Sequence, residues 1–378
     1  MRAVQVSWHL DPQRRSPAAL LEAWPTLRET ATAAAAAGAH VAVVQAADED
    51  ATIECDGVRF EFLRVARGSP VRARIGPWAA PVDARMLRRI EALRPDVVHQ
   101  HGLTHPLHAR TLSHRLDRPL LVQDHASRPP RRARGLHRWG FGTAAAVAFT
   151  AREQSAPFLA AGALPRTMRI LELLESSSRF TTGDRSEARR RTGLHGEPCL
   201  LWLGNLDANK DPLTVLRALE AAAGALPGVR LWLAYRRAPL LAQVRDAIAR
   251  SPLLSARVTL LGPQPRDRVE WLLRSADFLV QASSFEGSGY VVIEALACGA
   301  TPLVTDIPSF RRITGDGAAG GLFRPGDAAA LARLLEEWSA LDGAQLRRQA
   351  RARFEHALSF EVLGDELNAA YDGLVAGA

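Results

Sequence analysis

Short apolar runs alternate with longer amphipathic stretches in the first half of the chain. The runs with the length of buried strands are residues 4–7, 41–45, 96–99, 120–123 and 145–149. The stretches with helical spacing of apolar residues are 17–37, 83–93 and 105–115. Two further runs, 52–55 and 58–65, flank Asp56-Gly57, a dipeptide typical of hairpin turns. This half therefore predicts an α/β domain that contains one hairpin.

The second half repeats the alternation more regularly. Its predicted strands are 199–203, 229–234, 258–261, 278–281 and 301–304. Its predicted helices are 212–223, 238–250, 266–274 and 290–297, and two or three more helices follow Asp327. Short strands separated by helices predict parallel sheets that are covered on both faces. Two such domains leave a cleft at the carboxyl ends of their strands, where open α/β sheets bind ligands.

A chain of 378 residues fits two domains. Residues 172–197 are polar and charged and contain glycine, so they are the best linker candidate. We predict a first domain over 1–180, a second over 181–355, and a C-terminal helix at 356–378 that packs back on the first domain. No stretch approaches the unbroken apolar length of a membrane span, and residues 1–10 resemble a strand rather than a signal peptide, so we expect a cytoplasmic protein.

The composition adds a formal charge of +8, and Lys210 is the only lysine among 48 basic residues. The charge has three interpretations: arginine spread over a solvated surface, attraction to phosphate-bearing substrates or an anionic membrane, and nucleic-acid binding. No recognised nucleic-acid motif supports the third. The three cysteines, Cys55, Cys199 and Cys298, are far apart and outside any C-x-x-C pattern, which disfavours a disulfide framework or a cysteine zinc site.

The most informative segment is residues 283–299, which follows a predicted strand and opens a helix. Gly287, Ser288 and Gly289 form a small-residue turn in which the backbone can approach a ligand closely. Free N–H groups at the start of the helix favour an anion there. Glu286 lies before this turn and Glu294 about one turn inside the helix. The two carboxylates are therefore expected to line one site at this end of the helix.

A second segment, Gly204-Asn205-Leu206-Asp207-Ala208-Asn209-Lys210-Asp211-Pro212, also leads from a strand through a turn into a helix. It delivers Lys210, a compact point charge, to the same edge of the predicted sheet. An ordinary solvated lysine is the alternative interpretation.

These segments resemble the retaining GT-B glycosyltransferases of family 4. E-G-S-G-Y-V-V-I-E-A-L-A-C-G resembles the family signature with its two glutamates, and G-N-L-D-A-N-K-D resembles its glycine-arginine to lysine stretch. V-V-H-Q-H-G at 97–102 and V-Q-D-H at 122–125 resemble its N-terminal motifs. The resemblance implies two Rossmann-like doubly wound domains, the first binding the acceptor and the second a nucleotide-sugar donor.

The resemblance also implies residue roles. Lys210 would bind the donor diphosphate, Glu286 would face the transferred sugar, and Glu294 would hydrogen-bond the ribose. His125 would lie near the reacting centre on the acceptor side. Further donor contacts are implied for Gly204, Asn205, Gly262, Gly287, Ser288 and Gly289, and an acceptor-side position for His101. We take Glu286, His125 and Lys210 as the candidate catalytic residues.

Two departures from the family pattern stand out. Asn205 occupies the position where the family usually has an arginine, so one expected diphosphate cation is missing there; Arg236, Arg237 or another arginine can replace it. The early glycine-rich turn of the family appears here as Gln13-Arg14-Arg15-Ser16-Pro17. A catalytically degenerate nucleotide-sugar-binding protein is therefore one alternative.

The resulting prediction is a bacterial retaining glycosyltransferase, of hexosyltransferase type, that uses UDP-sugar or GDP-sugar and requires neither a cofactor nor a divalent metal. The expected partners are the donor and a glycan, lipid-linked or small-molecule acceptor, with no nucleic acid and with peripheral contact to the inner membrane left open. Another GT-B enzyme, such as a nucleotide-sugar epimerase, is the nearest rival.

Three other features have both a functional and a plain interpretation. Six histidines lie between residues 99 and 125, but their spacing matches no H-E-x-x-H pattern, which disfavours a metal site. Asp48-Glu49-Asp50 imitates a D-x-D metal motif, although an exposed acidic loop is the preferred interpretation. The arginine-rich segment 128–134 is either a solvated loop or a contact with a membrane or an anionic acceptor.

Overall fold

The computed structural model describes residues 1–66, 78 and 80–377. The chain forms two compact units, one of Met1–Ser176 with Phe360–Ala378 and one of Ser177–Ser359. The boundary after the N-terminal part of the first unit thus lies between Ser176 and Ser177, whereas the sequence predicted it between residues 180 and 181. The C-terminal segment from Phe360 belongs to the first unit.

The first unit is built on a mostly parallel sheet. In its described residues the strand order is β3-β4-β2-β1-β5-β6-β7-β8, and only β3 and β4 pair antiparallel. The strands are β1 (Arg2–Ser7), β2 (His40–Ala47), β3 (Ala51–Cys55), β4 (Val58–Arg64), β5 (Val97–His101), β6 (Leu120–Gln123), β7 (Ala146–Phe149) and β8 (Ile170–Glu172). The predicted hairpin at Asp56-Gly57 is confirmed, and both turn residues have positive φ, as a tight hairpin requires.

Helices cover this sheet. They are α1 (Pro17–Ala23), α2 (Pro25–Ala36), α4 (Ala84–Ala92), α5 (Pro106–Leu116), α6 (Arg134–Phe141), the 3₁₀ helix η2 (Arg152–Ser155), α7 (Ala156–Ala160) and α17 (Phe360–Val375). The single helix predicted over 17–37 is wrong, because Trp24 has non-helical backbone angles and Pro25 starts a new helix. A proline has no N–H to donate and its ring blocks the preceding turn, so the break falls there.

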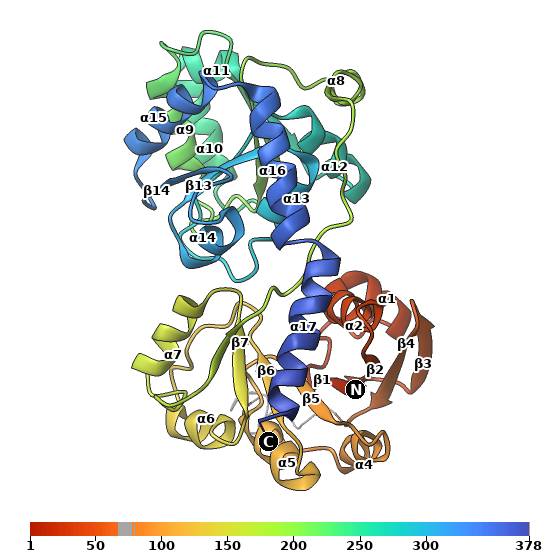
Figure 1. Cartoon of the computed structure of the whole chain (residues 1–378). Coiled ribbons are helices and arrows are strands. Elements are labelled where there is room, and N and C mark those ends of the chain that lie inside the picture. Colours follow the sequence, from red (N-terminus) through yellow and green to blue (C-terminus); the bar gives the residue numbers. More distant parts are fainter. Residues whose placement is uncertain (67–77, 79, 378) are drawn as a thin grey trace. The chain divides into compact units, whose positions relative to one another are not determined.

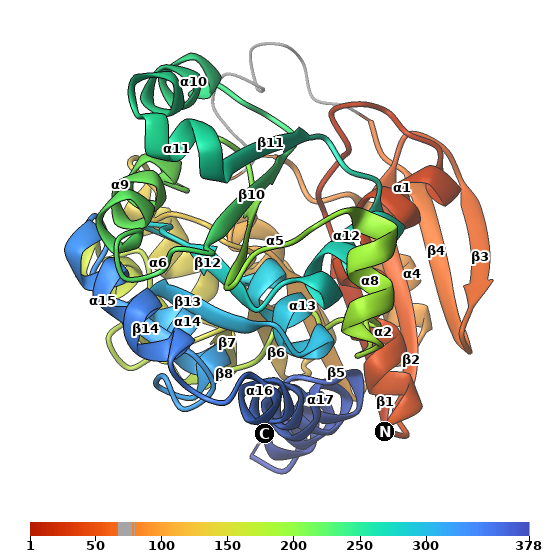
Figure 2. The same ribbon diagram turned by 90° about the horizontal axis from the view of Figure 1, so that it is seen from above.

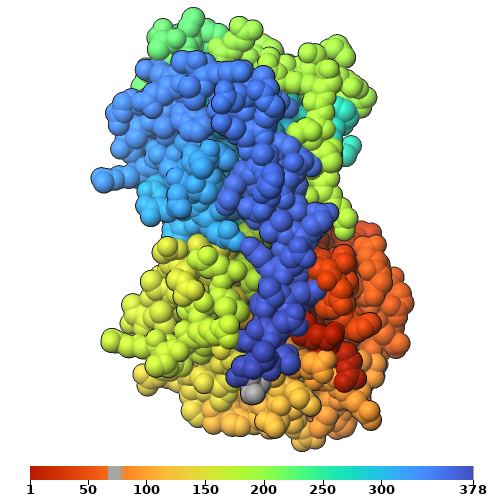
Figure 3. All heavy atoms as spheres, in the orientation of Figure 1, coloured from red at the N-terminus to blue at the C-terminus, as the bar shows by residue number. Residues whose placement is uncertain are grey.

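The C-terminal helix α17 packs against α2 and β5 of the first unit (Figure 1). Its buried face consists of Leu363, Gly364, Leu367, Tyr371 and Leu374. Its opposite face lies at the surface of the molecule (Figure 3). Gly364 lies so close to the backbone carbonyl of Ala33 that a Cβ atom there would overlap it. The missing side chain therefore permits the two helices to touch.

The second unit contains a parallel sheet in the order β11-β10-β9-β12-β13-β14, counted over the residues that the structure describes. The strands are β9 (Cys199–Gly204), β10 (Arg230–Tyr235), β11 (Val258–Gly262), β12 (Phe278–Gln281), β13 (Thr301–Thr305) and β14 (Gly321–Phe323). Five of them match predicted runs to within one or two residues. β14 is only three residues long and was not predicted.

The helices of this unit cover both faces of its sheet. They are α8 (Arg185–Thr192), α9 (Pro212–Ala222), α10 (Leu241–Arg250), α11 (Pro252–Arg257), α12 (Arg266–Ser275), α13 (Tyr290–Cys298), α14 (Pro308–Thr314), α15 (Ala328–Ser339) and α16 (Gly343–Ala357). Helices α12 and α13 lie side by side (Figure 2). The linker predicted over 172–197 is corrected, since α8 lies inside it. Asp184 caps the start of α8 through the Glu187 N–H, and Gly193 ends it with a left-handed backbone.

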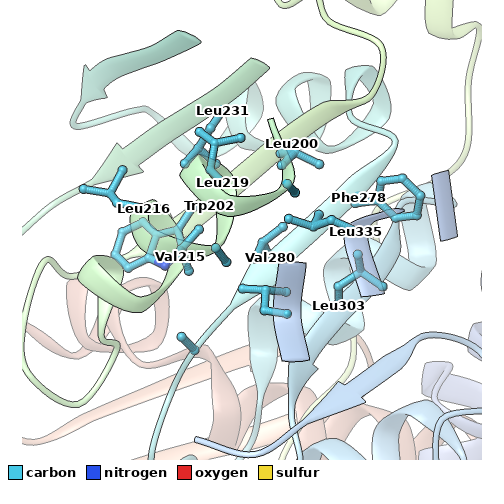
Figure 4. Packing of buried hydrophobic residues seen from close by; sticks show 14 of the residues in the cluster. Leu200, Trp202, Val215, Leu216, Leu219, Leu231, Phe278, Val280, Leu303 and Leu335 are labelled. Carbon is cyan, nitrogen blue, oxygen red and sulfur yellow. The ribbon is translucent and has the colours of Figure 1, made fainter. Parts of the chain in front are cut away.

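Apolar side chains from the strands and helices of the second unit interlock in one core (Figure 4). Trp202 of β9 is fully buried there, beside Val215, Leu216 and Leu219 on the inner face of α9. Burying each of these side chains stabilises the fold by about 1.5–3 kcal/mol relative to leaving it in water. Among the described residues, no helix combines the length and the apolar character that a bilayer crossing requires.

Each sheet has one point where the strand order reverses. In the first unit β1 has β2 on one side and β5 on the other, and in the second unit β9 lies between β10 and β12. The chain leaves the sheet toward opposite faces from the two strands at such a point, which opens a crevice at their carboxyl ends. Lys210, Glu286 and His101 lie at or after the ends of strands at these points, whereas His125 follows β6 and Gly262 ends β11.

Candidate active site

The turn after β9 is fixed by its own polar groups. Gly204 ends the strand, and the Lys210 N–H donates to the Asp207 carboxylate at 3.0 Å. Asp211 then caps α9 by accepting from the Thr214 N–H at 3.1 Å. A Cβ atom at position 204 would lie 3.3 Å from the Trp202 ring and 3.7 Å from the Lys210 side chain. A side chain at position 204 would therefore press on the Trp202 ring, whereas its contact with Lys210 would be an ordinary one.

The segment after β12 is joined to this turn by three hydrogen bonds. The Ser284 N–H donates to the Asn209 carbonyl at 2.8 Å, and its hydroxyl donates to the Asn209 side chain at 3.0 Å. The Asn209 side-chain amide donates to the Phe285 carbonyl at 2.9 Å. Gln281 adds a buried bond to the Leu203 carbonyl at 2.6 Å. The two segments highlighted by the sequence therefore form one structural feature at the β9–β12 switch point.

Lys210 and Glu286 form an ion pair within this feature. Their side chains are 20% and 15% exposed, so each is partly withdrawn from water but still reachable. A carboxylate neutralises the ammonium group here. An incoming anion would displace the Glu286 carboxylate from Lys210. The released carboxylate would then be available to accept hydrogen bonds from hydroxyl groups of the same ligand.

Gly289 precedes α13 and has a φ of +59°, a backbone conformation that side chains disfavour. A Cβ atom there would lie 2.5 Å from the Ile313 Cδ1 atom. Glycine is therefore required both by the backbone and by the packing of α14 beneath it. The first N–H groups of α13 lack helical partners within their own helix, which makes this end attractive to anions.

Glu294 lies deeper in α13, with its side chain 2% exposed, and forms an ion pair with Arg266. Arg266 is 59% exposed and its guanidinium lies 4.5 Å from the Phe180 ring centre and 5.7 Å from that of Tyr290. The two glutamates of the signature therefore have separate cationic partners, Lys210 for one and Arg266 for the other. A ligand that binds Glu294 must share it with Arg266.

Two donor-side candidates lie at neighbouring strand ends. The Asn205 side chain accepts a hydrogen bond from the Arg237 N–H at 3.2 Å, which ties the turn after β9 to the segment after β10. Gly262 ends β11 with a φ of +69°, and the Gln264 side chain donates to the Leu261 carbonyl beside it at 2.8 Å. Asn205 therefore joins the segments that follow β9 and β10, and it supplies no positive charge.

In the first unit, His101 at the end of β5 and His125 after β6 lie in one hydrogen-bonded row. His125 Nε2 lies 2.9 Å from His101 Nδ1, and His125 Nδ1 lies 3.2 Å from Glu175 Oε2. A carboxylate can only accept, so His125 Nδ1 carries the proton of that contact. Both ring nitrogens of His125 are therefore engaged by the protein.

The row continues into the core. His101 Nε2 lies 3.0 Å from the Gln5 side chain, and the Tyr371 hydroxyl lies 2.8 Å from His99 Nδ1 and 3.1 Å from the Gln5 amide. Burial lowers the pKa of His99 to about 3 and holds the pKa of His101 well below its usual range. Both rings are thus neutral at physiological pH, and α17 takes part in the row through Tyr371.

The remaining histidines of the run do not join this row. His105 and His108 lie together, with ring centres 5.0 Å apart, and His114 is on the last turn of α5. Burial lowers the pKa of His105 to about 3 and that of His108 to about 4. Within the described part of the chain, no three His, Cys, Asp or Glu side chains are grouped as a metal site would need.

The acidic motif at 48–50 has a local role. Asp50 accepts from the Arg64 N–H at 2.8 Å and pairs with Arg85 at 2.8 Å. These contacts join the start of β3 to the end of β4 and to the first turn of α4. Cys199 and Cys298 are buried, and burial raises the pKa of the Cys199 thiol to about 12, so it stays protonated and unreactive.

Two residues of the first unit were not predicted. Glu175 follows β8 at the carboxyl edge of the sheet and is 8% exposed. Asp124 is 5% exposed, and burial raises the pKa of its carboxyl group to about 6. Asp124 stands beside His125 in the sequence and could have been suspected, but no pattern in the sequence connects Glu175 with His125.

Comparisons with known proteins cover both halves of the chain. The family model described as "Glycosyl transferases group 1" matches residues 184–355, and the one described as "Glycosyl transferase 4-like domain" matches residues 23–172. The D-inositol 3-phosphate glycosyltransferase of Nocardia farcinica is 33% identical over 193 residues, which are 48% of this chain and 42% of that protein. The one of Mycobacterium ulcerans is 32% identical over 206 residues, 51% of this chain and 42% of that protein.

These matches span less than half the length of the curated relatives. Among solved structures, Anabaena HepE in complex with UDP superimposes with a TM-score of 0.69 at 16% identity, covering 99% of this chain and 100% of that one. Sucrose-phosphate synthase from Thermosynechococcus elongatus gives a TM-score of 0.68 at 19% identity and covers both chains fully. At these identities the structural likeness establishes the fold, which is GT-B.

The match of one family model to each half agrees with the resemblance of the glutamate and histidine motifs. The chain belongs to the group 1 glycosyltransferases of the family 4 type.

Proposed function

We propose that this glycosyltransferase transfers a sugar from a nucleoside diphosphate sugar with retention of configuration and without a divalent metal. The observation that carries the proposal is the Lys210–Glu286 pair at the β9–β12 switch point of the second sheet. It combines a cation for a departing phosphate with a carboxylate for sugar hydroxyl groups, within hydrogen-bonding contact of one another.

The chemistry assigns a task to each group. When the sugar–phosphate bond breaks, negative charge grows on the diphosphate and positive character grows on the sugar. Lys210 and the N-terminus of α13 stabilise the first, and Glu286, freed from Lys210, favours the second. Glu294 hydrogen-bonds the ribose in exchange for part of its contact with Arg266. The acceptor then attacks from the face that the diphosphate leaves.

The acceptor side is assigned to the first unit. His125, held between His101 and Glu175, offers a fixed ring there rather than a free nitrogen. Its role is therefore to shape and polarise the acceptor site, because a ring whose two nitrogens are both hydrogen-bonded is poorly placed to remove a proton.

The comparisons support particular substrates to test. Solved neighbours were crystallised with UDP and with UDP-glucose, so a uridine nucleotide is the first donor to examine. The curated relatives are named D-inositol 3-phosphate glycosyltransferases, so a phosphorylated cyclic polyol is the first acceptor.

Thermal unfolding with nucleotides tests the donor assignment. We would compare UDP, GDP, ADP, dTDP and CDP in the presence of EDTA, using the wild type, Lys210→Ala and Arg250→Ala, an exposed arginine at the far end of α10. A nucleotide at 100 times its Kd stabilises the protein by about 2.7 kcal/mol. We expect one nucleotide to raise the Tm of the wild type and of Arg250→Ala, and to raise that of Lys210→Ala much less.

Turnover supplies the second measurement. Removing a leaving-group cation should lower the transfer rate about 100-fold or more. NMR of the product reports whether the anomeric configuration is retained. Near-normal turnover by Lys210→Ala, a requirement for added metal, or an inverted product would each contradict a separate part of the proposal.

A further inference from the structure

The turn after β9 has a charge deficit for its proposed ligand. Lys210 is the only cationic side chain among residues 204–210, and Glu286 neutralises it. A nucleoside diphosphate brings two phosphate groups, each with at least one negative charge near neutral pH. The helix terminus of α13 contributes only about half a charge, so a second cation near the carboxyl end of β9 would complete the site.

The neighbours of β9 are β10 and β12. No arginine or lysine follows β12 before α14, where Arg311 pairs with Asp306. Two arginines, Arg236 and Arg237, directly follow β10. Both are exposed, and neither forms an ion pair with any residue that the structure describes. Two uncompensated guanidinium groups thus stand at the strand end adjacent to the Lys210 turn.

Hydrogen bonds hold these arginines against that turn. The Arg236 N–H donates to the Gly204 carbonyl at 3.3 Å, and the Leu206 N–H donates to the Arg237 carbonyl at 2.8 Å. The Asn205 side chain accepts from the Arg237 N–H at 3.2 Å. The Leu240 N–H closes the loop onto the Leu206 carbonyl at 2.9 Å. The backbone of 236–237 is therefore held within the same hydrogen-bonded turn, from which the two exposed side chains extend.

We propose that Arg236 and Arg237 supply the second cation for the donor diphosphate, and that Asn205 positions them. This inference rests on the proposed donor function of the second unit. A guanidinium group binds phosphate oxygens through two parallel N–H bonds, which a point charge such as Lys210 does not. Asn205 thus serves the diphosphate indirectly, by fixing the backbone from which the two arginines extend.

Calorimetric binding to the full-length protein tests the assignment. The probes are UDP and UMP, GDP and GMP, and ADP and AMP, each with EDTA, so that each pair differs only in the second phosphate. For the pair that the wild type binds, we expect Arg236→Ala/Arg237→Ala to weaken diphosphate binding roughly 10-fold or more. Monophosphate binding should change less than about threefold, and Arg250→Ala should leave both unchanged.

A rescue variant separates the role of charge from that of the local fold. Adding Asn205→Arg to the double variant places a guanidinium group directly in the turn, and we expect it to recover most of the lost diphosphate affinity. An unchanged diphosphate Kd in the double variant would overturn the inference, and so would equal weakening of diphosphate and monophosphate. If the wild type binds none of these six nucleotides and neither dTDP nor CDP, it is the donor function that fails, and this outcome is distinct from an unchanged diphosphate Kd in the double variant.

Discussion

Asp124 is a residue whose ionisation the fold alters directly. Its carboxyl group is 5% exposed beside His125, and burial raises its pKa to about 6 from an ordinary value near 3.8. The folded protein therefore binds the proton more tightly than the unfolded chain does. Between about pH 4 and pH 6 the folded state keeps this proton while the unfolded chain has largely lost it, so stability falls as the pH rises.

Replacing this carboxyl group by an amide should remove that pH-dependent penalty. We expect Asp124→Asn to be more stable than the wild type at pH 7.5 by about 1–3 kcal/mol, since each pKa unit corresponds to about 1.4 kcal/mol. The advantage should shrink as the pH falls toward 4, because the folded Asp124 carboxyl group is then protonated and uncharged like the amide. Urea denaturation at pH 4.5, 6 and 7.5 measures it, with the exposed Asp246→Asn as the matched control. An advantage that stays constant with pH would show that the penalty has another cause.

At this scale the sequence was informative about residue types but not about partners. Lys210, Glu286 and Glu294 were found because strand, turn and helix signals surround them within one short segment each. Glu175 was missed because its contact with His125 joins residues 50 positions apart. The ion pair between Arg266 and Glu294 was missed for the same reason, since it depends on how α12 packs beside α13.

At the scale of elements, the close approach of α17 to α2 depends on one glycine. A Cβ atom at position 364 would overlap the Ala33 carbonyl, whereas one at position 373 of the same helix would meet nothing closer than 3.7 Å. We expect Gly364→Ala to destabilise the first unit by about 1–3 kcal/mol, because the helices must separate.

Gly373→Ala is the matched substitution in that helix. It faces solvent, so the higher helix propensity of alanine should leave stability unchanged or raise it by up to about 1 kcal/mol. Urea denaturation, with hydrogen exchange of α2 and α17 as the local measure, distinguishes the two sites. Equal effects of both substitutions would mean that helix propensity, and not contact between the helices, governs α17.

Most elements could be predicted from the sequence because their signals are local. Asp83 caps α4, Asp56-Gly57 turns the hairpin, and most strands of the second sheet are short, mainly apolar runs. The errors have local causes too. Pro25 was passed over inside an alanine-rich stretch, and α8 was hidden because only Ala188 of its eight residues is buried.

At the scale of the whole molecule, the two units differ in continuity. The second unit is a single stretch, Ser177–Ser359, with its own core around Trp202. The first needs α17 from the far end of the chain, which buries Leu363, Leu367 and Tyr371. Without α17, the hydroxyl group that contacts His99 and Gln5 is missing and an apolar face of the unit is open to water.

This difference predicts how fragments behave. Residues 177–359 expressed alone should show a cooperative thermal transition, because every element of that core is present, whereas residues 1–176 alone should show a weak transition or none. Joining 1–176 to 360–378 by a short Gly/Ser linker should restore cooperativity. Such a linker is long enough because the Ser177 hydroxyl bonds to the Leu358 carbonyl, so the two ends lie together. Circular dichroism and calorimetry measure all three fragments. If 1–176 alone unfolds as cooperatively as the linked form, α17 is an accessory helix, and its polar contact with His99 does not hold His101 and His125 in place.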